Sequence, residues 1–151
     1  MANIVKLRVL IKRLDSGLNL QVPAYQSEHA VGLDLPAAIE SDLVIKPGVI
    51  VSIPCGFSIA IPSGYEGQIR PRSGLAMKGI SIPNTPGTID PDYRGEVSVL
   101  LINHGSQDFR VTRGMRVAQL VVLPVPRIEW QEVKELPSTG RGSGGFGHTG
   151  E

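Results

Sequence analysis

The chain has 151 residues, about the length of a single domain with one sizeable core. Its fifteen basic and fourteen acidic side chains give a net charge of +1, which excludes the broad positive field that drives nonspecific binding to nucleic acids. Apolar runs stay well short of the ~20 residues that span a bilayer, no signal peptide is evident, and the one cysteine, Cys55, cannot form an internal disulfide. We therefore expect one soluble domain in a reducing cytoplasm, with no nucleic-acid or membrane partner.

Short apolar runs rich in Val and Ile are separated by Gly or Pro about every ten residues, a spacing typical of strands. This pattern predicts an all-β sandwich or barrel. The expected strands are 4–11, 32–36, 43–45, 49–53, 57–61, 66–71, 96–102, 108–111 and 116–125. Within the last strand, the apolar run 121–125 indicates burial on both faces, either inside the sandwich or against another subunit.

One short helix is expected over Ser73–Lys78, because Leu, Ala, Met and Lys follow one another there and all form helices well. Ser73 is the expected N-cap, since its hydroxyl can accept a hydrogen bond from a free N–H of the first turn. Gly79 is expected to end the helix.

The C-terminal residues differ in composition from the rest of the chain. From Leu136 onward the apolar pattern stops, and small and polar residues follow. We therefore expect a compact body over residues 1–135 and a flexible, glycine-rich arm over residues 136–151. An aromatic ring at Phe146, set among glycines, is expected to serve a ligand, since it gains nothing by remaining in water.

Two segments carry residue types suited to catalysis or phosphate binding, and each also has a purely structural explanation. Residues 88–95 contain Asp-Pro-Asp, which is ordinary in hairpin turns. Residues 71–74 place an arginine, a serine and the start of a helix in sequence, which suits either phosphate binding or helix capping. Neither segment by itself decides between these alternatives. Histidine and cysteine show no spacing typical of a metal site, and Cys55 is expected to be a small core residue.

Five segments taken together change this interpretation. In chain order they are 30–35 (AVGLDL), 71–76 (PRSGLA), 87–95 (GTIDPDYRG), 113–120 (RGMRVAQL) and 141–147 (RGSGGFG). The chain resembles the trimeric dUTP diphosphatase (dUTPase) family, which carries five motifs in this order. The resemblance implies a jelly-roll-like β-sandwich or distorted barrel, a homotrimer with shared active sites, and a magnesium-dependent enzyme. Its reaction would be dUTP plus water to dUMP and diphosphate, which keeps uracil out of DNA and supplies dUMP for thymidylate synthesis.

The resemblance assigns catalysis to Asp90, as the general base that orients a water for in-line attack on the α-phosphorus. An ionised carboxylate within hydrogen-bond reach can accept a proton from that water. The Mg²⁺ cofactor would be held by the triphosphate, in keeping with an ion that retains several of its waters. Asp34 would contact the metal only through water.

The substrate-binding residues follow from the same motifs. Arg72, Ser73, the backbone at Gly74, and Gln119 would offset charge on the phosphates. The base and sugar would be bound by the hairpin residues Asn84, Gly87, Thr88, Ile89 and Tyr93. The backbone of this hairpin would match the uracil edge and reject cytosine, while the Tyr93 ring would exclude a ribose 2′-hydroxyl.

The arm would act as a lid over the bound nucleotide. Phe146 would stack on the uracil, while Arg141 and the glycine-rich backbone would close on the terminal phosphates. The arm residues assigned to the substrate are Arg141, Ser143, Gly144, Gly145, Phe146 and Gly147. We expect the arm to serve a neighbouring subunit, since a flexible segment can reach across a closed ring.

Two positions depart from the family pattern. Met115 stands where an acid is frequent, and Val31 stands where a small residue is usual. The alternatives to a dUTPase are a dCTP deaminase of the same fold and a non-catalytic β-sandwich protein that binds nucleic acid or supports an assembly. The intact hairpin motif and the phenylalanine in the arm favour the diphosphatase over the deaminase.

Overall fold

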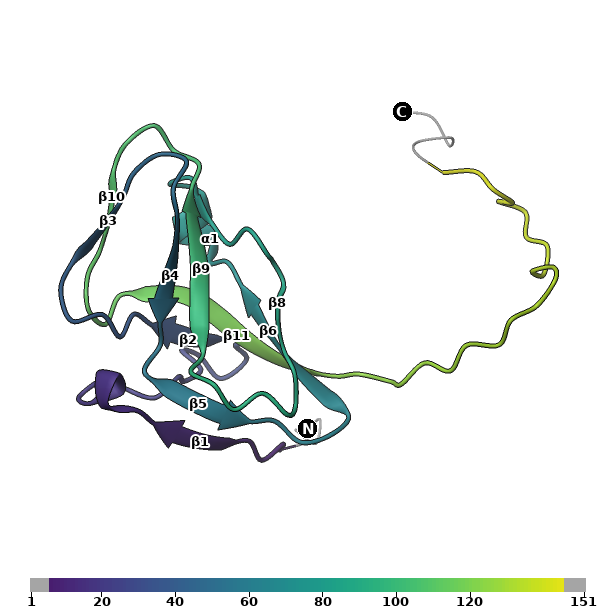
Figure 1. Cartoon of the computed structure of the whole chain (residues 1–151), viewed down its shortest axis with the longest axis horizontal. Coiled ribbons are helices and arrows are strands. Elements are labelled where there is room, and N and C mark those ends of the chain that lie inside the picture. The colour runs from purple at the N-terminus through teal and green to yellow at the C-terminus, as the bar shows by residue number, and fades with distance from the viewer. Residues whose placement is uncertain (1–5, 146–151) are drawn as a thin grey trace.

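The computed structural model describes residues 6–145 of the chain. It is almost entirely β-structure, with one short α-helix and one turn of 3₁₀ helix (Figure 1). In chain order the elements are β1 (Leu10–Arg13), η1 (Asp15–Gly17), β2 (Leu33–Pro36), β3 (Leu43–Ile45), β4 (Ile50–Pro54), β5 (Phe57–Ala60), β6 (Tyr65–Arg70), α1 (Ser73–Ala76), β7 (Ile80–Ser81), β8 (Gly87–Ile89), β9 (Ser98–Asn103), β10 (Phe109–Val111) and β11 (Arg116–Pro124).

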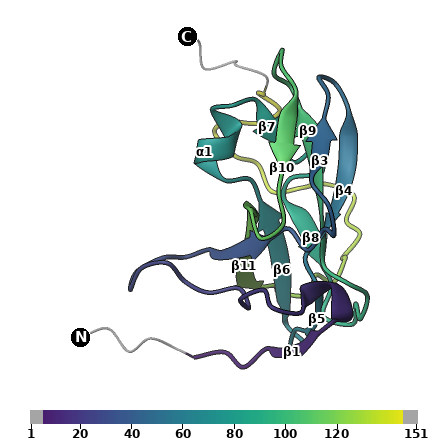
Figure 2. The same ribbon diagram turned by 90° about the vertical axis from the view of Figure 1, so that its left-hand side faces the viewer.

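The largest sheet has four strands in the order β2-β11-β6-β8, and every pairing in it is antiparallel. Strands β4, β9 and β7 form a second sheet, and the pairs β1–β5 and β3–β10 complete the body. In Figure 1 the β4–β9 pair runs across the direction of β11. Figure 2 shows α1 and β7 at one end of the body and β1 at the other. This arrangement confirms the jelly-roll-like, all-β fold that the sequence predicts.

The core is built from aliphatic side chains of all the sheets. Its fully buried members include Leu35, Ile45, Ile53, Leu101 and Val117. Removing such a side chain from water contributes about 1.5–3 kcal/mol. Leu120 and Val121 are consecutive in β11 and both buried, so this strand is covered on both faces at that point. Within the apolar run 121–125, however, only Val121 is buried and Val125 is 40% exposed, so burial of the whole run inside the sandwich is wrong and its burial against another subunit stays a prediction.

The predicted strands differ from the observed ones at the N-terminus and around the hairpin. A strand over 4–11 is wrong for the described residues, because pairing with β5 sets the ladder over Leu10–Arg13. Sequence reasoning also missed β7 and β8, which have two and three residues. Segments this short form because neighbouring strands offer backbone partners, and they are too short to show a hydrophobic period.

The helix begins at Ser73 as expected but is shorter than predicted. It covers Ser73–Ala76, and its N-cap is Arg72, which is extended and makes no capping hydrogen bond through its side chain. The prediction that Ser73 caps the helix is therefore wrong. The chain enters α1 from β6 in extended conformation through Pro71, so the change to helical geometry falls one residue earlier. Gly79, with φ +80°, ends the turn as predicted.

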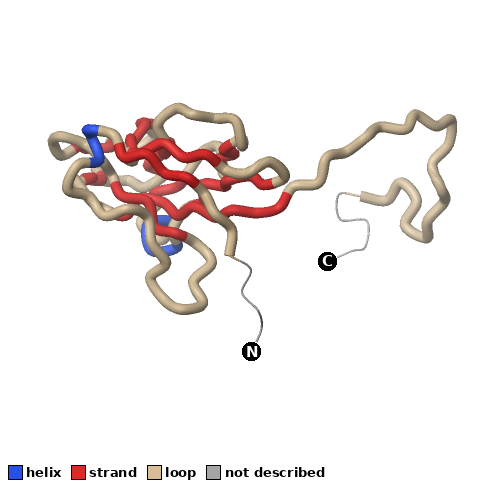
Figure 3. Tube along the Cα trace, turned by 90° about the horizontal axis from the view of Figure 1, so that it is seen from below, coloured by secondary structure: helices blue, strands red, loops and turns tan. Residues whose placement is uncertain are grey.

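After β11 the chain leaves the body (Figure 3). Residues 125–145 contain neither helix nor strand and are exposed over almost their whole length. Even large apolar side chains lie in solvent here, with Trp130 88% and Leu136 84% exposed. A boundary between body and arm at residue 135 stays a prediction, while the last strand ends at Pro124. Among residues 6–145 there is no helix of the length and apolarity required to cross a membrane.

Candidate active site

The residues expected to bind the base and sugar lie together in one small pocket, which we call the hairpin pocket. Its volume is about 190 Å³. All six hairpin residues singled out in the sequence line it: Asn84, Gly87, Thr88, Ile89, Asp90 and Tyr93. Residues from four further positions complete the wall, namely Ile69, Glu96, Val97 and Ser98. A pocket of this size, with backbone on one side, suits a small planar ligand.

Strand β8 forms one side of the hairpin pocket. It pairs with β6 through Gly67, Gln68 and Ile69, and it is the edge strand of the four-stranded sheet. A Cβ on Gly87 would lie 3.3 Å from both the Ile69 Cβ and the Asn84 side-chain nitrogen. The absence of a side chain at Gly87 therefore lets β8 lie close to β6 and leaves its backbone accessible from the pocket.

Tyr93 is held by two features of the residues that follow it. Its hydroxyl donates a hydrogen bond to the carbonyl oxygen of Glu96 at 3.1 Å. Its ring lies directly over Gly95, where an added Cβ would be 2.3 Å from the phenolic oxygen. Arg94 closes the turn by donating to the carbonyls of Pro91 and Tyr93. The ring position is therefore fixed by the local sequence Tyr-Arg-Gly-Glu.

Asp90 stands where three hollows meet. It lines the hairpin pocket, a second hollow shared with residues 125–128, and a third shared with Arg94 and Arg127. Asp90 is exposed, and its carbonyl accepts a hydrogen bond from the Tyr93 N–H at 3.1 Å. A carboxylate in this position can reach both a ligand in the hairpin pocket and water from outside.

Glu96 was not predicted as a site residue, yet it braces the hairpin pocket from behind. Its Oε1 accepts hydrogen bonds from the Ser16 hydroxyl at 3.1 Å and the Gly56 N–H at 2.9 Å. These partners are 80 and 40 residues away in sequence, so no local pattern reveals the contact. The hairpin is thereby attached to η1 and to the turn between β4 and β5.

A second group of predicted residues gathers near the start of β11, and we call it the arginine cluster. Arg72 Nε donates to Asp34 Oδ1 at 3.1 Å, and Arg116 Nη1 donates to Asp34 Oδ2 at 3.0 Å. Arg72 Nη1 also donates to the carbonyl of Arg116 at 2.9 Å. Two guanidinium groups thus share one carboxylate, and the cluster keeps a net positive charge suited to an anion.

Gln119 lies beside the arginine cluster. Its Nε2 donates to the carbonyl of Pro71 at 2.9 Å, just before Arg72. A Cβ on Gly32 would lie 2.2 Å from the Gln119 Oε1, so Gly32 provides the room for this side chain. Gln119 therefore fixes the backbone from which Arg72 extends.

Ser73 and Gly74 are the first two residues of α1, and both are exposed. A Cβ on Gly74 would meet nothing within 4 Å among the described residues. Packing among the described residues of this chain therefore does not require glycine at position 74.

The residues that the structure describes do not form a cage for a metal ion. From residue 6 to residue 145, no group of three or more His, Cys, Asp and Glu side chains is placed to hold one. Both oxygens of Asp34 accept from arginine. That Mg²⁺ is held by the triphosphate, and that Asp34 contacts it through water, stay predictions.

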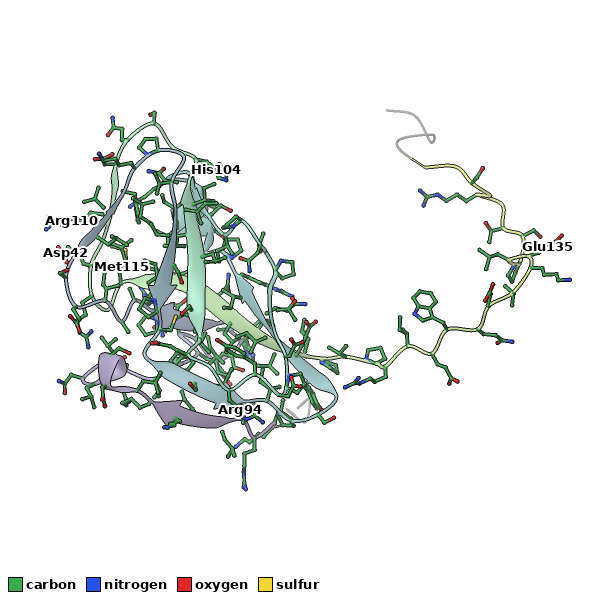
Figure 4. All side chains as sticks on the ribbon, viewed as in Figure 1. Asp42, Arg94, His104, Arg110, Met115 and Glu135 are labelled. Carbon is green, nitrogen blue, oxygen red and sulfur yellow. The ribbon has the colours of Figure 1, made fainter. Side chains whose placement is uncertain are left out.

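The described part of the arm, residues 136–145, joins neither group. Arg141 Nε donates within the arm, to the Gly144 carbonyl at 2.8 Å, and Ser143 and Gly145 lie in the same exposed stretch. Figure 4 shows Glu135, the residue before the arm, far from Arg94 of the hairpin. Phe146 and Gly147 lie outside the described residues.

The hairpin pocket and the arginine cluster are also separate from each other. Among the described residues, the lining of the hairpin pocket includes none of Arg72, Ser73, Gly74 and Gln119. The two groups occur on different parts of one sheet, with the arginine cluster at the β2 side of β11 and the pocket at β8, beyond β6.

Comparison of the sequence with known protein families identifies the family of this chain. The sequence model of the dUTPase family matches residues 19–150.

The chain belongs to the dUTPase family.

Several relatives of this dUTPase are similar to it along nearly all of their length. It is 53% identical to the deoxyuridine 5'-triphosphate nucleotidohydrolase of Syntrophotalea carbinolica over 94% of this chain and 96% of that protein. It is 57% identical to the enzyme of the same name from Desulfotalea psychrophila over 87% and 88% of the two chains. Among solved structures, the dUTPase of Staphylococcus bacteriophage 80alpha with dUpNHpp superimposes with a TM-score of 0.85 at 26% identity, covering 95% of this chain and 99% of the other.

The two departures from the family pattern lie outside both groups of site residues. Met115 is partly buried against the core, and its carbonyl accepts the Ala37 N–H at 2.8 Å (Figure 4). Val31 is 69% exposed. Cys55 is buried as predicted. Burial, with a smaller contribution from the charge of Glu96, raises the pKa of its thiol to about 12, which makes it a poor nucleophile.

Proposed function

We propose that this dUTPase hydrolyses dUTP to dUMP and diphosphate, thereby keeping uracil out of DNA and supplying dUMP for thymidylate synthesis. The observation that carries the proposal is the convergence of all six predicted hairpin residues on one small pocket, with a carboxylate at its rim. The names of the relatives, deoxyuridine 5'-triphosphate nucleotidohydrolases of high identity, support the same substrate.

The base is recognised by backbone. Because β8 is an edge strand, the N–H and C=O groups on its unpaired side are available to the pocket. Uracil presents a donor at N3 between two acceptors, which backbone groups of an extended strand can pair. Cytosine reverses this pattern at N3 and C4 and would leave buried groups without partners, at a cost of about 1–3 kcal/mol for each.

The sugar is recognised by Tyr93. With its ring fixed over Gly95 and its hydroxyl bonded to Glu96, it forms a rigid wall of the pocket. A deoxyribose packs against this wall, whereas a ribose 2′-hydroxyl would overlap with it. A pocket wall of this shape favours binding of dUTP over binding of UTP.

Hydrolysis uses Asp90 as the base. A water oxygen forms a bond to the α-phosphorus, the bond from that phosphorus to the α–β bridging oxygen breaks, and the proton of the water moves to the Asp90 carboxylate. Arg72, Gln119 and the first turn of α1 stabilise charge on the phosphates as the diphosphate leaves. Mg²⁺, carried by the triphosphate, would supply further charge neutralisation.

The site is assembled from several copies of the chain in a cytoplasmic homotrimer. The separation of hairpin pocket from arginine cluster supports a site completed by a neighbour. The nine residues of β11 span roughly 26 Å from first to last at about 3.3 Å per residue. The arginine cluster lies at the first end of this strand, while the arm leaves from the other end, beside Asp90 of its own chain. The arm therefore begins at the end of β11 that lies away from the arginine cluster of its own chain, which supports contact with a neighbour.

The test of the function is a product assay. The protein is incubated with dUTP or with dCTP in the presence of magnesium, and diphosphate and ammonia are measured. We expect diphosphate from dUTP and no ammonia from dCTP. Ammonia would identify a dCTP deaminase, and neither product would favour a non-catalytic role in binding nucleic acid or in assembly.

The test of the shared site is complementation. A chain truncated after Val133 is refolded with an equal amount of full-length Asp90→Asn, and mixed trimers are verified by mass. If Asp90 and the arm of one site come from different chains, about a quarter of the sites regain both intact parts. Mixed trimers with no activity above the two parents would show that the arm serves its own subunit.

A further inference from the structure

The wall that Tyr93 contributes to the hairpin pocket rests on two residues, Gly95 and Glu96. The Tyr93 ring lies over Gly95, where an added Cβ would be 2.5 Å from the ring atom Cζ, and the Tyr93 hydroxyl donates to the Glu96 carbonyl at 3.1 Å. This stretch of chain lies between β8, which ends at Ile89, and β9, which begins at Ser98. The position of the ring therefore depends on what holds the backbone at residues 95 and 96.

The side chain of Glu96 fastens this backbone to distant parts of the chain. The next residue, Val97, exchanges backbone hydrogen bonds with residues 55 and 57 at the turn between β4 and β5. Glu96 Oε1 accepts from the Gly56 N–H at 2.9 Å and from the Ser16 hydroxyl at 3.1 Å. Hydrogen bonds to an ionised carboxylate are roughly twice as strong as neutral ones. The attachment of the hairpin thus extends by one residue, to the carbonyl that holds the tyrosine.

The two donors to Glu96 are themselves fixed, because η1 packs closely against the turn between β4 and β5. A Cβ on Gly17 of η1 would lie 2.1 Å from the Gly56 carbonyl oxygen, and one on Gly56 would lie 2.4 Å from the Gly17 Cα. The same carbonyl accepts the Leu14 N–H at 2.9 Å. A side chain at either glycine would push η1 off the turn and carry the Ser16 hydroxyl away from Glu96.

Two arginines bind the backbone carbonyls of η1 and of the residue after it. Arg113 Nη2 donates to the carbonyls of Ser16 at 2.9 Å and Leu18 at 2.8 Å. Arg13 Nη1 donates to the carbonyl of Gly17 at 2.9 Å. A guanidinium presents its donors in a fixed planar arrangement, so these contacts fix the backbone that carries the Ser16 hydroxyl. The carboxylate of Glu96 is therefore bound to a rigid support.

We propose that Glu96 is a positioning residue for sugar selection: bound to Ser16 and Gly56, it fixes the backbone on which the Tyr93 ring rests. The inference deepens the proposed function and rests on it, since there Tyr93 contacts the deoxyribose. Glu96 acts through Tyr93. The group to be excluded is a single 2′-hydroxyl, so a small displacement of the ring is enough to admit ribose, and selection requires a wall that its neighbours hold in place.

The test measures kcat/KM for dUTP and for UTP in the wild type, Glu96→Ala, Glu96→Gln and Ser16→Ala. We expect the preference for dUTP to fall by roughly two- to tenfold in Glu96→Ala, the range for the net loss of a hydrogen bond. Ser16→Ala removes one of the two bonds and should give a smaller fall. Glu96→Gln keeps an oxygen that can accept both bonds, so it should retain most of the preference. The affinities for dUMP and UMP, measured by calorimetry, repeat the comparison without turnover.

Two comparisons separate positioning of Tyr93 from a general loosening of the pocket. The preference for dUTP over dCTP is assigned to the backbone of β8, which pairs with β6, so it should keep its wild-type value in Glu96→Ala. In a Gly95→Ala background, where the ring is already displaced, Glu96→Ala should change the sugar preference less than it does in the wild type. A base preference narrowed by the same factor, or fully additive effects in the double variant, would overturn the proposal.

A matched control is Asp42, whose Oδ2 forms an ion pair with Arg110 Nη2 at 2.7 Å, far from Arg94 of the hairpin (Figure 4). Asp42→Ala should leave the sugar preference unchanged. If Glu96→Ala fails to fold, judged by thermal unfolding, Ser16→Ala decides, because it deletes only one half-buried hydroxyl.

The possible failures of the two proposals are distinguishable. Wild-type protein that does not hydrolyse dUTP would refute the proposed function itself. Active wild type whose sugar preference is unchanged in Glu96→Ala and Ser16→Ala would refute only the positioning role. A Glu96→Gln variant as impaired as Glu96→Ala would also refute it, since the charge of Glu96 and not its attachment would then be responsible.

Discussion

The hairpin pocket and the arm are both expected to contact the same nucleotide, yet they are built in opposite ways. The hairpin is held by a sheet ladder, by the close approach at Gly87 and Gly95, and by Glu96 contacts to distant segments. The chain after β11 is exposed over residues 126–143, and the hydrogen bonds of the described arm residues lie within the arm's own turns. One region is packed into the body, and the described part of the other lies outside it.

This difference implies that the hairpin and the arm contribute to nucleotide binding in different ways. Fixing the backbone of one residue costs about 1–2 kcal/mol in conformational entropy. If the substrate orders the arm, this cost cancels part of the binding free energy that the arm's contacts provide. The backbone of the hairpin is already fixed in the folded chain, so binding does not add this entropy cost there. We therefore expect the hairpin to discriminate between bases and sugars, and the arm to contribute closure and exclusion of water.

The largest effect is expected from Asp90→Asn, which breaks the chemistry at the rim of the rigid region. The amide cannot accept the proton of the water, and loss of a general base costs about 10²–10⁴ in rate. We expect kcat to fall within this range, while binding of dUTP, measured under single-turnover conditions, and trimer mass stay unchanged. Turnover close to wild type would remove Asp90 from the role of base.

Truncation after Val133 tests the arm and should have the next largest effect. The removed residues make no contact with the core in the described part of the chain, so the thermal unfolding temperature should hold. Loss of stacking alone, about 1–3 kcal/mol per base, predicts a fall in kcat/KM of at least roughly fivefold. Unchanged kcat/KM would mean that the rigid body binds dUTP without a lid.

Gly95→Ala sharpens the comparison by loosening one point of the hairpin pocket. The new methyl group would lie 2.3 Å from the Tyr93 oxygen, so the ring must move and its bond to Glu96 must break. We expect the preference for dUTP over UTP in kcat/KM to narrow several-fold, with Tyr93→Phe, which keeps the ring in place, showing a smaller change. The same preference in all three proteins would assign sugar recognition to another residue.

The smallest effect concerns Cys55, which lies behind the hairpin pocket and donates its N–H to Val97. Because burial raises the pKa of its thiol to about 12, Cys55 should resist a disulfide reagent at pH 8, where an introduced Ser143→Cys in the arm should react at once. The unfolded thiol ionises near pH 8.5, so the free energy of unfolding should decline as the pH rises from there towards 12. Rapid labelling of Cys55 would show that the hairpin region opens.

The sequence predicts those parts of this enzyme that depend on residues close together in the chain. Alternating apolar runs gave eight strands close to their observed positions, and the hairpin residues form a single pocket because they lie within ten positions of each other. The role of Glu96 depends on partners 40 and 80 residues away. The Asp34–Arg116 contact depends on a bulge, and strand register cannot be derived from hydrophobic period alone. Three-residue β8 exists only because β6 lies beside it.

The exposed arm has a practical consequence for anyone who handles the protein. Arg127, Lys134 and Arg141 are all accessible after the last strand, so a trypsin-like protease can cut there without opening the core. We expect such a nick to leave the circular dichroism and the melting curve of the body intact while removing the segment proposed to act as a lid. A preparation assessed only by its fold would then pass as sound although it had lost activity, and intact mass is the quality check that detects the loss.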